Sequence, residues 1–100
     1  MMLMYVRLMT AQVHPGKIEE ALRLYHESVG PAIRGQPGFK SALLLIDRNT
    51  CKSITLILWE SEADLRAGEA SNSFQQQIAQ VAHVFSSTPA REVYEVSALA

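Results

Sequence analysis

The fold is decided by residues 53–74, SITLILWESEADLRAGEASNSF. Residues 53–59 carry apolar or β-branched side chains at both odd and even positions, which is typical of a strand covered on both faces. Acidic residues and a capping box, Ser61 with Asp64, follow without a linker and predict that a helix begins there. A strand with two apolar faces is unusual in a small protein, so something must cover its second face.

The composition predicts one cytoplasmic domain over residues 1–100. The chain is 48% hydrophobic and 19% charged, which suits a globular protein with a single core. Its 9 basic and 10 acidic residues are spread along the chain, so we expect neither nucleic acid nor membrane as a partner. The apolar opening lacks a basic leader and meets Arg7 early, which indicates a strand and not a signal peptide. Cys51 is the only cysteine, in agreement with a reducing compartment.

Hydrophobic periodicity predicts the order strand, helix, strand, strand, helix, strand. Gly30 and Pro31 end or interrupt the first helix. Gly68 and residues 71–73 break the second helix, and Ser73 with Gln76 offers a further capping box from which it restarts. We expect strands at residues 3–13, 40–47, 53–60 and 91–99, a first helix at 17–29, and a second helix from 61 that Pro89 stops.

This order matches an α+β, ferredoxin-like βαββαβ protomer with an antiparallel sheet and both helices on one face. The other face would expose about six large apolar side chains and forgo on the order of 10–15 kcal/mol of hydrophobic stabilisation. A second copy of the chain is the simplest cover, so we expect a homodimer. Odd and even numbering divides the sheet residues into two candidate faces: Val6, Leu8, Ala42, Leu44, Ile46, Ile54, Leu56 and Leu58, against Leu3, Tyr5, Met9, Leu43, Leu45, Ile57 and Trp59.

Four short motifs resemble the antibiotic biosynthesis monooxygenase-like (ABM) family of dimeric α/β-barrel proteins. They are HPGK at 14–17, QPGF at 36–39, LLLIDRNT at 43–50 and WESEADLRAGEASNSF at 59–74. The resemblance implies a ferredoxin-like protomer whose sheet pairs with that of a second protomer to form a barrel, with a ligand cleft between sheet and helices. It also implies one of several activities, including cofactor-independent oxygenation of polycyclic phenols and haem degradation.

The resemblance disfavours haem degradation. Haem-degrading relatives use an Asn on the first strand, a Trp in the second helix and a His further along it. The matching positions here are Met9, Gly68 and Ile78. Other members often place a His or an aromatic residue where Gly68 stands, so the resemblance also implies a changed pocket.

The candidate ligand-binding residues are Trp59, Arg7, Tyr5, Tyr94 and Phe85. Trp59 ends a strand and offers a planar surface to an aromatic ligand, or it anchors the core or the dimer interface. Tyr5 and Tyr94, and likewise Tyr25, each hydrogen-bond a ligand carbonyl or stand at the edge of the core. Phe85 lies on the apolar stripe of the last helical run.

Two of the candidates carry charge or titrate near neutral pH. Arg7 interrupts an apolar strand and either pairs with an acid, for which Glu92 and Glu95 are candidates, or binds an anionic or phenolic ligand. His83 is the candidate catalytic residue as a proton acceptor in a pocket, with a partly exposed structural histidine as the alternative. No histidines have the spacing of a metal site, so we expect no bound metal.

Two functions follow from these observations. The first is a homodimer with a pocket for a hydrophobic or aromatic metabolite, acting as a cofactor-independent monooxygenase. Such an enzyme needs a substrate that itself gives an electron to oxygen, together with a base and an apolar site. The second is a non-catalytic ligand-binding or structural dimer. We expect no cofactor in either case.

Overall fold

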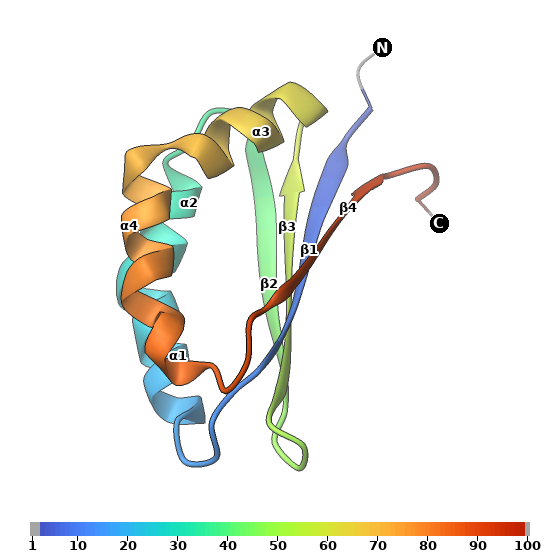
Figure 1. The fold of residues 1–100 in the computed structure, drawn as a ribbon. Coiled ribbons are helices and arrows are strands. Elements are labelled where there is room, and N and C mark those ends of the chain that lie inside the picture. The colour runs from blue at the N-terminus through green and yellow to red at the C-terminus, as the bar shows by residue number, and fades with distance from the viewer. Residues whose placement is uncertain (1–2, 100) are drawn as a thin grey trace.

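The computed structural model describes residues 3–99 and shows one sheet with every helix on the same side of it (Figure 1). Residues 1–2 and 100, which the predicted domain includes, lie outside the described residues. The sheet is antiparallel and its strand order is β2-β3-β1-β4, which confirms the ferredoxin-like prediction. The strands are β1 (Tyr5–Gln12), β2 (Phe39–Asp47), β3 (Lys52–Trp59) and β4 (Ala90–Glu95).

The prediction allowed Gly30 and Pro31 either to end or to interrupt the first helix. They do not end it, because the helical segment continues through both residues. It comprises α1 (Ile18–Leu24), the π-helical turn η1 (Tyr25–Val29) and α2 (Gly30–Arg34). Proline lacks a backbone N–H and crowds the preceding turn, but the wider π-helical turn before it changes the hydrogen-bonding pattern. Pro31 therefore stands in the first turn of α2, where no donor is required.

The predicted break of the second helical segment is confirmed at Ser71, within residues 71–73, whereas Gly68 lies inside a continuous helix. The segment comprises α3 (Glu62–Ala70), α4 (Asn72–Val81) and the short 3₁₀ turn η2 (Ala82–Val84). The Ser61 cap is confirmed, because its hydroxyl accepts a hydrogen bond from the Asp64 backbone N–H at 3.1 Å. The predicted cap at Ser73 is wrong: Ser71 accepts from the Phe74 N–H at 3.2 Å, and Ser73 lies inside α4.

The assignment of β2 to the two sheet faces by odd and even numbering is also wrong. Asp47 pairs with Lys52 across residues 48–51, so paired positions of β2 and β3 have opposite parity, as in Leu43 opposite Leu56. Residues that pair side by side point to the same face of a sheet. Ala42, Leu44 and Ile46 therefore share the helix face with Ile57 and Trp59 of β3.

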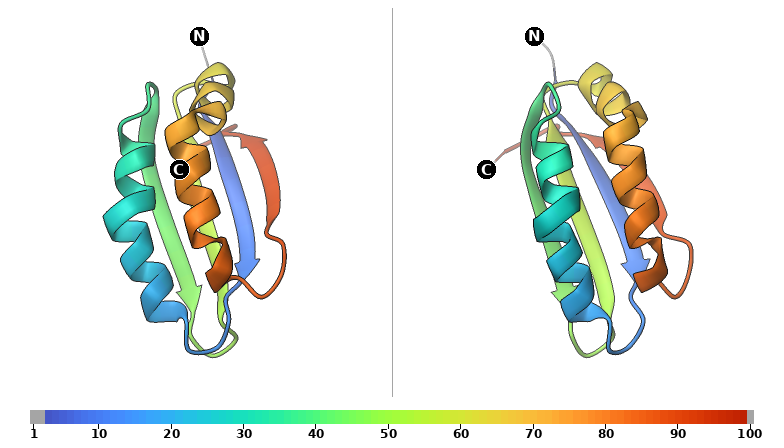
Figure 2. Two further views of the ribbon diagram at one scale, coloured as in Figure 1. Left: turned by 60° about the vertical axis from the view of Figure 1, so that its left-hand side comes forward. Right: turned by 90° about the vertical axis from the view of Figure 1, so that its left-hand side faces the viewer.

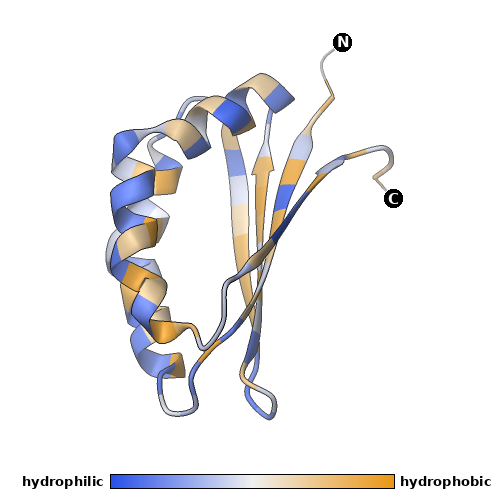
Figure 3. Ribbon diagram, viewed as in Figure 1, coloured by the Kyte–Doolittle hydropathy of each residue, from blue (hydrophilic) through white to orange (hydrophobic). Residues whose placement is uncertain are grey.

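The core lies between the sheet and the helices, which pack as a second layer on that face (Figure 2). Hydrophobic residues recur along β1 and β3 (Figure 3). Trp59, Ile33, Leu65, Val13 and Val84 are the largest fully buried side chains. No helix within residues 3–99 is both long and apolar enough to cross a membrane.

Candidate functional site

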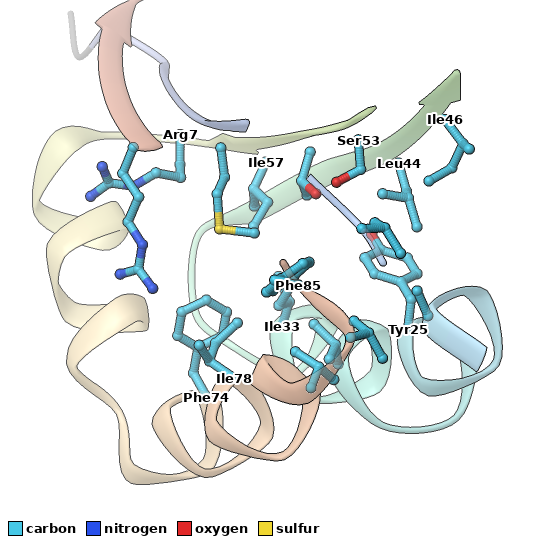
Figure 4. A pocket seen from close by; sticks show the side chains of 18 of the residues that line it. Arg7, Tyr25, Ile33, Leu44, Ile46, Ser53, Ile57, Phe74, Ile78 and Phe85 are labelled. Atoms are coloured by element: carbon cyan, nitrogen blue, oxygen red, sulfur yellow. The ribbon is translucent and has the colours of Figure 1, made fainter. Parts of the chain in front are cut away.

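A cavity lies between the helix face of the sheet and the helices that cover it (Figure 4). Counted as the space open to the centres of water molecules, its volume is about 70 Å³. A single water needs roughly 10–15 Å³ on this measure, so the space admits a group larger than one solvent molecule. Its lining is mainly apolar, which is the character of small-molecule sites.

The sheet supplies one wall of the cavity through alternate residues of its strands. β3 contributes Ser53, Thr55 and Ile57, which are all buried. β1 contributes Arg7 and Met9 on the same face, since successive side chains of a strand point to opposite sides. The Ser53 hydroxyl also donates a long hydrogen bond of 3.4 Å to the carbonyl of Ala11 on β1.

The helices supply the opposite wall. Tyr25 comes from the π-helical turn, Ile33 from α2, and Phe74 and Ile78 from α4. Phe74 and Ile78 are four residues apart and therefore lie on one side of α4, facing the sheet. The cavity is thus bounded by residues from distant parts of the chain.

The charged residues of the lining are Arg7, Glu69 and Arg91. Arg7 donates from Nε to Glu69 Oε2 at 2.6 Å, and its Nη2 contacts the other carboxylate oxygen. This arrangement is bidentate, the geometry in which arginine binds carboxylates most strongly. The prediction that Arg7 pairs with Glu92 or Glu95 is therefore wrong: the acid is on α3 and not on the neighbouring strand.

Tyr25 contributes a neutral hydroxyl group to the cavity. Burial raises the pKa of the Tyr25 phenol above its usual value, because the anion is poorly solvated there, and the nearby Arg34 charge opposes this shift. At neutral pH the phenol keeps its proton and can donate a hydrogen bond. It is therefore unsuited to act as a base near pH 7.

The structure brings two of the sequence-predicted site residues, Arg7 and Phe85, into the cavity lining. Tyr5 and Trp59 belong to the core and lie outside that lining. Tyr94 is exposed on the opposite face of the sheet, where its hydroxyl donates a hydrogen bond to Glu92. His83 is also outside the lining, with its Nε2 3.4 Å from Glu20 Oε2 on the protein surface.

Gly68 explains where the Trp59 indole lies. A Cβ atom added at Gly68 would stand 2.2 Å from Trp59 Cη2, far inside van der Waals contact. The indole thus occupies the space beside α3 that a side chain at position 68 would fill. Trp59 is completely buried and packs edge to face on Phe39.

Sequence reasoning weighed Tyr25 as a ligand-binding or core residue, but it missed the other lining residues that carry polar groups or aromatic surface: Ser53, Thr55, Glu69, Phe74 and Arg91. The amphipathic pattern placed Tyr25 and Phe74 on buried stripes, but periodicity cannot separate core positions from cavity positions. The sequence pattern did not single out Glu69 or Arg91, and the structure leaves Arg91 exposed while Glu69 is partly buried. Only the contact of Glu69 with Arg7, which is 62 positions earlier, distinguishes it.

An antiparallel sheet covered on one face by helices, with an apolar cavity between the two layers, defines a ferredoxin-like α+β protein. The chain belongs to the antibiotic biosynthesis monooxygenase family, whose model matches residues 4–80. This confirms the resemblance found in the sequence motifs.

The curated relatives include Rv2557 and MT2634, two uncharacterized proteins from strains of Mycobacterium tuberculosis. Each is 28% identical over 101 residues, covering 97% of this chain and 42% of the relative. The chain therefore spans less than half the length of the curated relatives that it matches.

Solved structures with the same fold include two oxygenases and a protein described only as conserved. A monooxygenase from Streptomyces coelicolor in complex with nanaomycin D has a TM-score of 0.83 at 19% identity, covering 98% of this chain and 91% of that one. SnoaB, a cofactor-independent oxygenase from Streptomyces nogalater, has a TM-score of 0.78 at 18% identity, covering 92% and 91%. A conserved protein from Methanosarcina mazei Go1 has a TM-score of 0.82 at 18% identity, covering 93% and 92%.

Proposed function

We propose that this chain is a single-domain cytoplasmic protein that binds a hydrophobic aromatic metabolite in the cavity and oxygenates it without a cofactor. The observation that carries the proposal is the mainly apolar cavity between sheet and helices, with Arg7 and Arg91 at its lining. Membership of the family and the shared fold with SnoaB and the nanaomycin-bound monooxygenase support the same activity.

In the proposed reaction the substrate is an electron-rich phenol, which reacts in its ionised form. The phenolate gives one electron to oxygen, and the resulting substrate radical and superoxide combine to form a peroxide. The peroxide takes up the proton that the phenol released, and loss of water from its carbon, which bears the one hydrogen of the original aromatic C–H, leaves a quinone carbonyl. One oxygen atom enters the product and the other leaves as water, with the substrate supplying all the electrons.

The contribution of the protein is to bind the anion and to exclude water. A guanidinium group beside the phenolate lowers the free energy of the ionised substrate, and an apolar site strengthens that interaction. Among the described residues, the lining contains no histidine, and its one carboxylate, Glu69, is engaged by Arg7. The arginines, and not a protein base, therefore provide most of the stabilisation of the ionised substrate.

Oxygen uptake with a panel of electron-rich phenols and anthrones, without added metal or flavin, tests the proposal. We expect uptake by the wild-type protein and a marked loss in Ile78→Phe, which narrows the cavity. Ala79→Phe is the matched control, because Ala79 is the exposed neighbour on α4 and lies outside the lining. His83→Gln tests the remaining candidate base. No uptake across the panel by a folded wild-type protein would contradict the enzyme proposal.

A non-catalytic binding protein is the second candidate, and the absence of a free base among the described lining residues favours it. Such a protein would bind the same aromatic compounds without consuming oxygen. Equilibrium dialysis with the compounds of the panel, run beside the oxygen measurements, separates the two functions. Binding without uptake would assign the chain to this second class.

We also propose that the chain is a homodimer through the uncovered face of its sheet. Leu43 is 57% exposed, Leu45 46% and Tyr94 49%, and within residues 3–99 no helix covers this face (Figure 1). Beside them lie half-buried apolar residues of two further strands: Val6 and Leu8 of β1, and Leu56 and Leu58 of β3. An exposed apolar patch of this kind marks an interface, and a second copy is the partner with a matching surface.

A further inference from the structure

The charged residues of the cavity come from three neighbouring elements. In the β1–β4 register Arg7 is opposite Val93 and Arg91 is opposite Met9, so the two arginines are diagonal neighbours on the helix face. Diagonal neighbours have backbones about 7–8 Å apart, within reach of long side chains. Glu69 approaches from α3 and contacts Arg7. The two guanidinium groups can therefore act on one ligand group.

The positive charges in the lining exceed the negative charges. Among the described lining residues, Arg7 and Arg91 are cations, Glu69 is the single anion, and the others, including the protonated Tyr25 phenol, are uncharged near neutral pH. The bidentate pair with Glu69 satisfies Arg7, whereas Arg91 has no ion-pair partner among residues 3–99. One positive charge, that of the solvent-exposed Arg91, is thus left without a protein counter-ion at the cavity.

Burial strengthens the electrostatic effect that the Arg7 and Glu69 charges have on a neighbouring group. Each of these side chains is only 13% exposed, so water screens them poorly. A third charged group placed beside them interacts more strongly than it would on an open surface. An anionic ligand is favoured by this environment, while a cationic ligand is repelled by the excess arginine.

The far end of the cavity has a different character. Ser53 is opposite Ala11 on β1, which is four residues beyond Arg7 and therefore about 13 Å away along the strand. Tyr25 lies near Ser53 at this end, away from Arg7 (Figure 4). Between these two levels of the sheet lie Met9, Thr55 and Leu44, since Met9 and Leu44 are both paired with Thr55. The cavity runs from a cationic end through a mainly apolar middle to a hydrogen-bonding end whose lining residues are uncharged, with Arg34 near Tyr25 but outside the lining.

We propose that the ligand of this cavity is an aromatic monoanion, a carboxylate or an acidic phenol, whose negative group binds Arg91 and Arg7 while its rings extend toward Tyr25. The inference rests on the proposed function, because it names the class of molecule that the cavity takes. Glu69 competes with the ligand for Arg7 and limits the site to a single negative charge. Neutral aromatic compounds of the same size bind more weakly.

Two fluorescent probes of equal size test the charge preference directly. 2-Naphthoate is an anion at pH 7, and 2-naphthamide is its neutral counterpart of nearly the same shape. Titration of each with the wild-type protein, followed by fluorescence anisotropy, gives the two dissociation constants. We expect naphthoate to bind about tenfold or more tightly, as is usual for a hydrogen-bonded charged group over a neutral one.

Variants of the charged residues identify the groups responsible. Arg91→Gln should remove most of the preference for naphthoate, and Glu69→Gln should strengthen naphthoate binding while leaving naphthamide unchanged. Arg7→Gln alone leaves the Glu69 carboxylate unpaired and can unfold the protein, so the double variant Arg7→Gln/Glu69→Gln replaces it. The matched control is Arg66→Gln, because Arg66 is an exposed arginine of α3 that pairs with Glu62 outside the lining.

The outcomes separate this inference from the proposed function. Equal affinities of the wild-type protein for the two probes would overturn the charge preference and leave a ligand cavity in place. Binding of neither probe would overturn both. A loss of preference in Arg66→Gln as large as in Arg91→Gln would also overturn the inference, because the attraction would then be general. A preference lost in Arg91→Gln and in the double variant, but kept in Arg66→Gln, supports it.

Discussion

Gly68 lies inside α3, where alanine normally gives a helix about 1 kcal/mol more stability than glycine. Here the Trp59 ring reverses that preference, because a Cβ at this position would overlap Cη2 and Cζ3 of the indole. We expect Gly68→Ala to lower the free energy of unfolding by about 1–3 kcal/mol, the usual cost of overpacking a core. Urea denaturation measures the change.

Gly35→Ala is the matched control for the Gly68 substitution. Gly35 is also associated with a helix, at the C-terminus of α2, but an added Cβ there meets only the Pro31 carbonyl at 3.8 Å, an ordinary contact. We expect its stability to stay within about 0.5 kcal/mol of the wild type. Equal destabilisation by the two substitutions would show that the Trp59 contact is not the cause.

At the scale of elements, Ser71 connects α3 and α4 and its hydroxyl forms a hydrogen bond with the backbone of each helix. Its hydroxyl donates to the Gly68 carbonyl at the end of α3 at 2.9 Å and accepts from the Phe74 N–H at the start of α4. We expect Ser71→Ala to reduce the free energy of unfolding by about 1 kcal/mol, as for other N-cap serines. Thermal or urea unfolding of the purified variant gives the value.

Ser73→Ala provides the comparison for the Ser71 substitution, since Ser73 is exposed inside α4 and alanine is a better helix former. We expect that variant to be as stable as the wild type or slightly more so. If Ser73→Ala were the more damaging of the two, the helix boundary would lie where the sequence pattern first placed it.

At the scale of the whole molecule, the uncovered sheet face predicts the oligomeric state. Light scattering at micromolar concentration should give a mass near twice 11.1 kDa. The double variant Leu43→Glu/Leu45→Glu should be monomeric, because burying two carboxylates in an apolar interface without partners is strongly unfavourable. A wild-type protein that is a stable monomer would contradict the prediction.

A control for the interface variant carries added charge on the other layer of the molecule. Gln76 is exposed on α4, away from the sheet, so Gln76→Glu/Gln80→Glu adds the same two charges without touching the interface. We expect this variant to keep the mass of the wild type. Dissociation of the control to the same extent would indicate a general effect of net charge.

The sequence by itself determined the order of elements, the antiparallel ferredoxin-like topology, the helix start at Ser61 and the doubly apolar character of residues 53–59. These features depend on periodicity, turn residues and caps, which act between neighbours in the chain. The pairing of Arg7 with Glu69, the space that Gly68 leaves for Trp59, and the outward orientation of Leu43 and Leu45 on β2 were settled only by the tertiary structure. Each of these depends on contacts between distant residues, whose register and packing no local pattern encodes.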